Sequence, residues 1–121
     1  MDTRTSRYHD VYARWQREPE AFWAEAASDI DWVKPATKVF DDRQGLYGRW
    51  FVGAECNTCY NALDRHVERG RAEQAALIYD SPVTGSKRSF TYRVLLDEVA
   101  TLAAVLMDHG VGKGDRVVVY M

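Results

Sequence analysis

The residues whose types and spacing most clearly suggest chemistry are the two cysteines of the tetrapeptide Cys56-Asn57-Thr58-Cys59. A C-x-x-C motif at a helix start can form a redox pair, because the positive end of the helix lowers a thiol pKa. The same pair supplies two of the four ligands that a structural zinc ion needs. His66 would lie about two helical turns beyond Cys59. Plain packing cysteines are the third interpretation, and it is favoured because no βαβ pattern precedes the motif.

The other titratable residues have no spacing typical of a catalytic or metal site. His9, His66 and His109 form neither an H-x-x-H nor an H-E-x-x-H pattern, and the sequence contains no G-x-S-x-G. Asp41 and Asp42 are expected to lie in a solvated turn. These residues therefore do not indicate a nucleophile, a general base or a metal centre.

A glycine-rich stretch, Gly110-Val111-Gly112-Lys113-Gly114-Asp115, contains a lysine and resembles a phosphate loop only superficially. It lacks the pattern G-x-x-x-x-G-K-[ST]. It also follows a predicted helix, where the partial charge is negative, whereas phosphate binds at the positive start of a helix. We interpret it as a helix termination.

Length and composition limit the class of protein. The chain has 121 residues, 16 Lys plus Arg, 18 Asp plus Glu and a formal net charge of -2. That charge argues against a strongly basic nucleic-acid-binding protein, and two cysteines argue against a disulfide-dense scaffold. No apolar run approaches the ~20 residues that span a bilayer. The N-terminus has no apolar signal core, so we expect a cytoplasmic protein without nucleic-acid or membrane partners.

Hydrophobic periodicity and turn residues predict the elements that carry these groups. Tyr8, Val11, Tyr12 and Trp15 recur on one helical stripe after the capping residue Ser6. Helices are predicted over residues 7–17, from Pro19 to about 26, from Asn57 or Thr58 to about 69, and over 92–109. Strands are predicted over 75–79, 88–90 and 116–121, and residues 33–51 are expected to be irregular with short extended pieces at 38–40 and 49–52.

The aromatic residues are distributed unevenly. Residues 1–60 hold 11 of the 15 aromatic residues but only 6 Leu, Ile or Val, whereas residues 61–121 hold 16 of these aliphatic residues. A free-standing core needs aliphatic residues to reach native packing density. We therefore expect the first half to be an extension that packs on a larger body; a small aromatic-rich helical subdomain is the alternative. The expected anchors are Trp15, Phe22, Trp23, Trp32, Trp50 and Phe51.

The predicted last strand, RVVVYM over residues 116–121, has three consecutive valines and so points apolar side chains both ways. Such strands are normally buried on both faces of a parallel sheet. Together with the hairpin and the long helix it predicts a strand-helix-strand unit of an incomplete sheet. The predicted fold class is α/β, an α+β fragment with an N-terminal helical extension. A complete small α+β domain that ends on an edge strand is the alternative.

Five blocks of the sequence resemble the start of AMP-forming short-chain acyl-CoA synthetases, in the adenylate-forming superfamily. These blocks are YHDVYARW, EPEAFWAEAASDIDWVKP, RWFVGAECNTCYNALDRHVERGR, ALIYDSPVTGSKRSFTY and GVGKGDRVVVYM. Within that family the sequences of these blocks most resemble propionyl-CoA synthetases (propionate–CoA ligases), with acetyl-CoA synthetases as near relatives. One departure is Val94, where the family often has a glutamate that completes a capping box.

The resemblance implies a much longer parent enzyme that activates propionate or acetate with ATP and magnesium to an acyl-adenylate, which coenzyme A then attacks. It also implies an acetyl-CoA-synthetase-type N-terminal segment over 7–62 and the start of the AMP-binding domain over 63–121, while the polar residues 1–6 are expected to be flexible. The family's catalytic motifs would lie beyond Met121. We therefore predict no catalytic, cofactor-binding or metal-binding residue here, no cofactor held by the fragment, and the remainder of the enzyme as its partner.

Two functions outside this family stay open from the sequence. One is a stand-alone thiol redox module that uses Cys56 and Cys59. The other is a non-enzymatic interaction domain, which would unfold cooperatively as an isolated chain.

Overall fold

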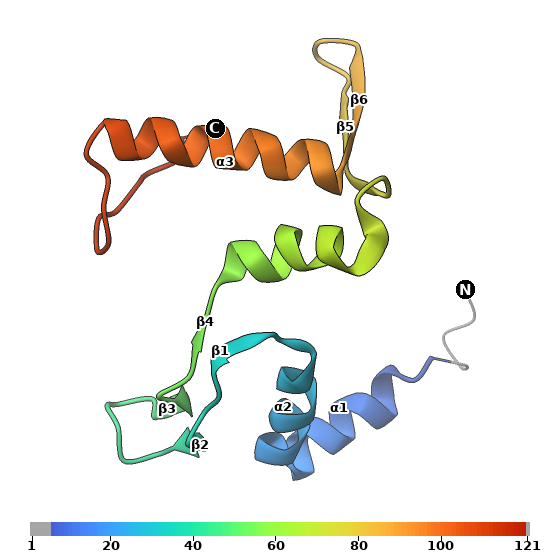
Figure 1. Ribbon diagram of the computed structural model, residues 1–121. Helices are drawn as coiled ribbons and strands as arrows, with labels where there is room; N and C mark the ends of the chain where they lie inside the picture. The colour runs from blue at the N-terminus through green and yellow to red at the C-terminus, as the bar shows by residue number, and fades with distance from the viewer. Residues whose placement is uncertain (1–5, 121) are drawn as a thin grey trace. The chain divides into compact units, whose positions relative to one another are not determined.

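The computed structural model describes residues 6–120 (Figure 1). The chain divides into two compact units, residues 1–61 (unit 1) and 62–121 (unit 2). Both are mixtures of helices and short antiparallel strands, which agrees with the predicted mixed fold class. Within the described range, none of the helices has the length and apolar character needed to cross a membrane. The stretch predicted to be flexible, residues 1–6, lies outside the described residues except for Ser6.

Unit 1 begins with two helices, α1 (Tyr8–Arg17) and α2 (Pro19–Ala26), followed by a short 3-10 turn, η2 (Ala27–Asp29). Both helices were predicted. The Ser6 hydroxyl oxygen accepts a hydrogen bond from the Tyr8 backbone N–H at 3.2 Å, which satisfies a donor that the helix itself leaves free. The predicted stripe forms as a row of rings, with Tyr12 5.7 Å from Tyr8 and 5.5 Å from Trp15 between centroids.

Four short strands complete unit 1. β2 (Lys38–Asp41) pairs antiparallel with β3 (Arg49–Val52), at the places the sequence predicts. β1 (Trp32–Lys34) pairs with β4 (Glu55–Cys56), with an irregular register. This second pair was not predicted. Strands of two and three residues are too short to show a hydrophobic period, and only their pairing with each other makes them recognisable as strands.

The third predicted helix is present between residues 58 and 71, with two π-helical segments, η3 (Tyr60–Asp64) and η4 (Val67–Arg71). The Asn57 side chain caps it by accepting a hydrogen bond from the Tyr60 backbone N–H at 3.0 Å. Gly70 lies in the left-handed region at φ 81°, as predicted for a helix-terminating glycine. The π-helical hydrogen bonding was not predicted; such segments are rare and often occur at functional sites.

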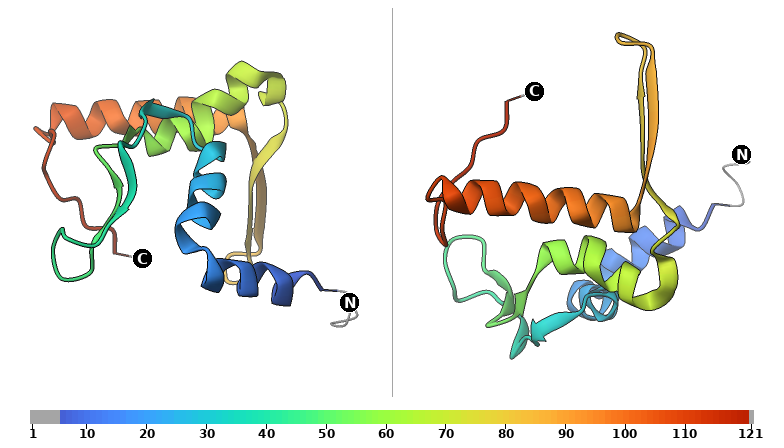
Figure 2. Two further views of the ribbon diagram at one scale, coloured as in Figure 1. Left: turned by 90° about the horizontal axis from the view of Figure 1, so that it is seen from below. Right: turned by 45° about the horizontal axis from the view of Figure 1, so that its top comes forward.

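Unit 2 contains a β-hairpin and the longest helix. β5 (Ala75–Ser81) pairs antiparallel with β6 (Ser86–Thr91), and α3 (Tyr92–Asp108) follows directly. The Thr91 hydroxyl oxygen accepts a hydrogen bond from the Val94 N–H at 3.3 Å, which confirms the predicted cap. The hairpin extends away from α3 and touches it only near its base (Figure 2).

The glycine-rich stretch after α3 ends the helix, as predicted. The Val111 N–H donates to the Leu106 carbonyl at 3.0 Å, and the Gly110 N–H donates to the Met107 carbonyl at 2.9 Å. Gly110 has φ 85°, which only glycine adopts without strain. This is the hydrogen-bond pattern of a Schellman termination.

The predicted last strand is not formed. Residues 111–120 contain neither helix nor strand, and the Met121 position lies outside the described residues. Val117, Val118 and Val119 are 54%, 88% and 70% exposed. A strand needs a neighbour for its backbone hydrogen bonds, and β5 and β6 pair only with each other among the described strands. The strand-helix-strand crossover expected from the sequence is therefore absent from the described residues.

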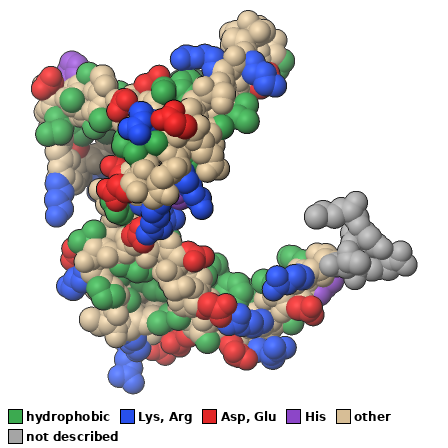
Figure 3. All heavy atoms as spheres, turned by 45° about the vertical axis from the view of Figure 1, so that its right-hand side comes forward, with side chains coloured by type: hydrophobic (Ala, Val, Ile, Leu, Met, Phe, Trp, Pro, Cys, Tyr) green, Lys and Arg blue, Asp and Glu red, His purple; other side chains and the backbone are tan. Residues whose placement is uncertain are grey.

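Very little of the chain is buried. Among the described residues only Leu63 and Ala72 are buried apolar side chains, and Asn61 is the buried polar one. The accessible surface is 10373 Å², whereas two separate compact units of half this mass would together expose about 8,000 Å². Hydrophobic side chains accordingly lie open on the visible surface (Figure 3).

Candidate functional site

The residues that suggested chemistry do not form a reactive centre. Cys56 lies in β4 opposite Trp32, and Cys59 lies in the first turn of the following helix. Both are exposed free thiols. In the described part of the chain no three His, Cys, Asp or Glu side chains are grouped as a metal ion would require. These observations give no support to the redox and zinc interpretations.

The histidines are separated and two of them lie against aromatic rings. His9 is in α1, with its ring edge-on to Tyr8 at 5.5 Å between centroids. His66 is in unit 2, where its ring lies 4.8 Å from the Tyr92 ring. His109 follows the last turn of α3. None of these places brings a histidine to a candidate nucleophile.

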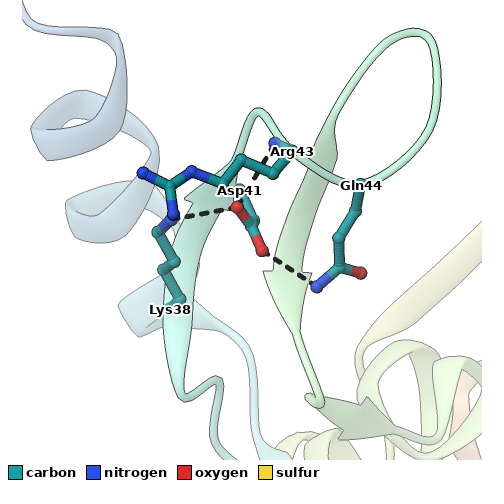
Figure 4. Close-up of polar contacts among 4 residues, drawn as sticks. All are labelled: Lys38, Asp41, Arg43 and Gln44. Carbon is teal, nitrogen blue, oxygen red and sulfur yellow. Dashed lines mark hydrogen bonds and ion pairs between the residues drawn. The ribbon is translucent and has the colours of Figure 1, made fainter.

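The Asp41 carboxylate organises the turn that joins β2 to β3 (Figure 4). Its oxygens accept hydrogen bonds from Lys38 Nζ at 3.1 Å, from Gln44 Nε2 at 2.9 Å and from the Arg43 backbone N–H at 3.3 Å. The Lys38 hydrogen bond, with the Gln44 and Arg43 contacts, lowers the Asp41 pKa below its ordinary value. The predicted turn is present, but Asp41 is not solvated as expected, because its side chain is only 17% exposed.

Asn61 is a buried polar residue that the sequence did not single out. Its Oδ1 accepts a hydrogen bond from the Asp31 backbone N–H at 2.8 Å, and its Nδ2 donates to the carbonyls of Asp31 at 3.0 Å and Asn57 at 2.9 Å. Asparagine disfavours helix interiors, where its amide competes with the backbone. An asparagine inside a predicted helix, between Tyr60 and Leu63, is therefore the sequence signal that could have identified Asn61 as a structural residue.

Unit 1 has an apolar groove of about 370 Å³ formed by α1, α2 and β3. We call it the tryptophan groove. Its rim residues Trp15, Trp23 and Trp50 are 36%, 41% and 39% exposed, although tryptophan is normally highly buried. The lining residues are Trp15, Pro19, Trp23, Trp50 and Phe51.

The helical wall of the groove is held by an ion pair between Arg14 of α1 and Glu25 of α2. The hydrogen bond and charge of this pair raise the pKa of Arg14 and lower that of Glu25. The Arg14 guanidinium also lies over the Phe22 ring, 5.8 Å from its centroid. This contact removes Phe22 from the groove although the sequence placed it among the anchors.

The strand wall is held by aromatic packing. The Trp50 ring packs against the Phe40 ring of β2 at 4.6 Å between centroids with the planes tilted by 41°, and the Phe51 ring lies 5.6 Å from Trp32 and 6.1 Å from Trp50. Phe51 has φ 49°, an uncommon conformation for a bulky residue. The Trp32 side chain has a structural role, because its Nε1–H donates a hydrogen bond to the Ala27 carbonyl at 2.8 Å.

Four of the six predicted anchors thus meet at one surface. No lining residue of the tryptophan groove carries a charge or a titratable group, so the groove has no means of acid–base or nucleophilic chemistry. Chemically, this arrangement offers rigid aromatic area for contact with another apolar surface.

Unit 2 has an open apolar surface of its own on α3. Leu102 is 59% exposed, and with Val105 it lines a shallow groove bordered by Asp97 and Glu98. The apolar period predicted for this helix is present, and its positions Leu95, Leu96, Val99 and Leu106 are partly buried.

Two sequence families match consecutive parts of the chain. Residues 8–62 match the family described as "Acetyl-coenzyme A synthetase N-terminus", and residues 63–121 match the family described as "AMP-binding enzyme".

Individual proteins agree with these matches. The chain is 48% identical to the human acyl-CoA synthetase short-chain family member 3, mitochondrial, over 96% of this chain and 17% of that protein. It is 46% identical to a propionate–CoA ligase of Salmonella typhimurium, over 94% of this chain and 18% of that protein. Among solved structures, an acetoacetyl-CoA synthetase from Streptomyces lividans superposes with a TM-score of 0.69 at 34% identity, over 86% of this chain and 16% of that one. The chain therefore spans less than a fifth of the length of each relative.

Proposed function

We propose that this chain is the N-terminal scaffold of a propionate- or acetate-activating ligase of the AMP-forming short-chain acyl-CoA synthetases, because its two parts match the N-terminal segment and the AMP-binding region of such enzymes. The observation that carries the proposal is the succession of two family matches, which follow each other without a gap from residue 8 to residue 121. The identity to the propionate–CoA ligase over 94% of the chain favours propionate as the substrate.

In the proposed reaction the carboxylate of the acid attacks the α-phosphorus of ATP and releases pyrophosphate, which leaves an acyl-adenylate. The thiol of coenzyme A then attacks the acyl carbon and releases AMP. We propose that this chain contributes none of the reacting groups, in keeping with the surface ion pairs Arg14–Glu25, Lys87–Asp80 and Arg93–Glu73 that occupy several of its charged side chains. Its role is to support the body that carries out the chemistry.

Magnesium, which the family implies, has no fitting ligand set in the described residues. Between residues 6 and 120 no three His, Cys, Asp or Glu side chains are grouped so that they could hold a metal ion, and magnesium in such sites depends largely on the phosphates of the substrate. We therefore assign no residue of this chain to the metal. The cytoplasmic location expected from the sequence stays a prediction.

A chimera tests the proposal. The 114 aligned residues of the Salmonella propionate–CoA ligase are replaced by this chain's aligned segment, and propionate-dependent formation of propionyl-CoA, AMP and pyrophosphate is measured. We expect an active chimera, because the segment supplies the same scaffold. The matched control is the same ligase with the 114 residues deleted, which should be inactive.

The isolated 121-residue chain completes this test. We expect no acyl-CoA from it with ATP, propionate and coenzyme A. Turnover by the purified chain, or a chimera as inactive as the deletion, would contradict the scaffold function.

A further inference from the structure

We propose that the tryptophan groove of unit 1 is a docking site for an apolar face of the AMP-binding region that follows the matched segment in the relatives. This inference rests on the proposed function and names the surface through which the scaffold acts. The groove is defined by Trp15, Pro19, Trp23, Trp50 and Phe51.

The chemistry of the lining selects an apolar partner. All five lining residues are uncharged, and three are tryptophans that leave more than a third of their surface open. Tryptophan is the residue type most enriched among side chains that dominate binding energy. A basic or acidic partner segment would lose its hydration here and find no opposite charge in return.

The groove is also preorganised. Trp50 is fixed by Phe40 at 4.6 Å, Phe51 is held between Trp32 and Trp50, and the Arg14–Glu25 ion pair joins the two helices of the other wall. Side chains that are ordered before association lose less conformational entropy when a partner arrives. The left-handed backbone conformation of Phe51 also indicates that this wall is ordered, because strain of this kind persists only where neighbouring packing enforces it.

The exposed surface area of this chain and the greater length of its relatives favour a partner within the same polypeptide. The chain exposes 10373 Å², more than about 2,000 Å² above what two compact units would expose, and large obligate interfaces have this size. The relatives are more than five times as long as this chain, which covers 17% and 18% of them. A tethered partner has an effective concentration in the millimolar range, so even a modest groove is filled.

Hydrogen exchange of the α2 amides that follow Pro19, residues 20–26, tests the docking in the chimera described above. We expect these amides to exchange at least about tenfold more slowly in the chimera than in the isolated chain, because docking raises the free energy of local opening. Trp23→Ala should abolish most of this protection, whereas Trp23→Phe should retain it. The matched control is Tyr47→Ala, which removes an aromatic ring that is 88% exposed and outside the groove.

Equal α2 exchange in chimera and isolated chain would overturn the proposal, as would full protection in Trp23→Ala. Protection that rises with concentration in the isolated chain would assign the groove to a second copy instead. Ligase activity of the same samples reports separately on the proposed function: an inactive chimera with protected α2 contradicts the function alone, and an active chimera with unprotected α2 contradicts the docking alone.

Discussion

Single side chains in this protein act mainly by tying backbone segments together. Asn61 joins residues that are thirty positions apart, and Asp41 joins three donors of one turn. Both are polar residues in a chain with very few buried apolar ones. Their hydrogen bonds therefore carry a larger share of local stability than such bonds do in a protein with a full core.

Replacing Asn61 by alanine should destabilise unit 1 by about 2 kcal/mol, because it leaves the Asp31 N–H and the Asn57 and Asp31 carbonyls without this partner. All four tryptophans lie in unit 1, so urea unfolding followed by tryptophan fluorescence measures this unit. Asn61→Asp keeps the acceptor but turns a carboxylate oxygen toward the Asp31 and Asn57 carbonyls in a buried site, so its loss of stability should be at least as large. An unchanged midpoint in Asn61→Ala would show that these bonds do not contribute to stability.

The hydrogen bonds of the Asp41 carboxylate should make the stability of the β2–β3 turn depend on pH. Its pKa is lowered from 3.8 in the folded state, chiefly by the hydrogen bond from Lys38. A lowered pKa means that the stabilisation is fully present above the unfolded value and is lost as the pH falls through the folded one. NMR titration of the carboxyl carbon should therefore give a pKa below 3.8. Lys38→Met should move it back toward 3.8, and a pKa at or above 3.8 in the unaltered chain contradicts the prediction.

At the scale of elements, the sheets are small and depend on their turns. The β2–β3 pair is four residues on each strand, below the size at which a hairpin is stable by itself. Its turn uses Gly48 at φ 69°, and a Cβ there would lie 2.4 Å from Cζ of the Phe40 ring. The same ring supports Trp50 of the tryptophan groove, so this glycine links the turn to the groove.

Gly48→Ala should lower the stability of unit 1 by about 2 kcal/mol or more, since it combines a left-handed backbone with displacement of a packed ring. Gly45→Ala is the matched control, because Gly45 has φ 75° in the same turn and open space around it. It should show only the backbone cost of about 1 kcal/mol. Equal losses in the two variants, by tryptophan fluorescence in urea, would remove the proposed clash with Phe40.

At the scale of the whole molecule, each unit exposes apolar surface that an independent domain would bury. Tryptophans are open in unit 1, and the α3 stripe and the valines of residues 117–119 are open in unit 2. Exposed apolar surface of this extent is typical of segments that bind another protein surface.

The isolated chain should accordingly bind the dye ANS and unfold without a single cooperative transition. Tryptophan fluorescence follows unit 1 and hydrogen exchange of α3 follows unit 2, so the two measurements should give different midpoints. Val118→Lys should reduce self-association, because a charge interrupts the exposed valine run. Coincident, sharp transitions without ANS binding would instead indicate a self-sufficient domain.

Local chemistry in the sequence was sufficient for the helices, the cap at Thr91 and the β5–β6 hairpin, because periodicity and capping are encoded within a few residues. The family resemblance was likewise carried by contiguous blocks, and the comparisons agree with it. Tertiary structure alone decided the β1–β4 pair, the role of Asn61 and which aromatic residues meet in one groove. Those features depend on contacts between residues far apart along the chain. For the same reason the RVVVYM stretch, strand-like in composition, stays unpaired: a strand is completed by its neighbour, and the described elements provide none.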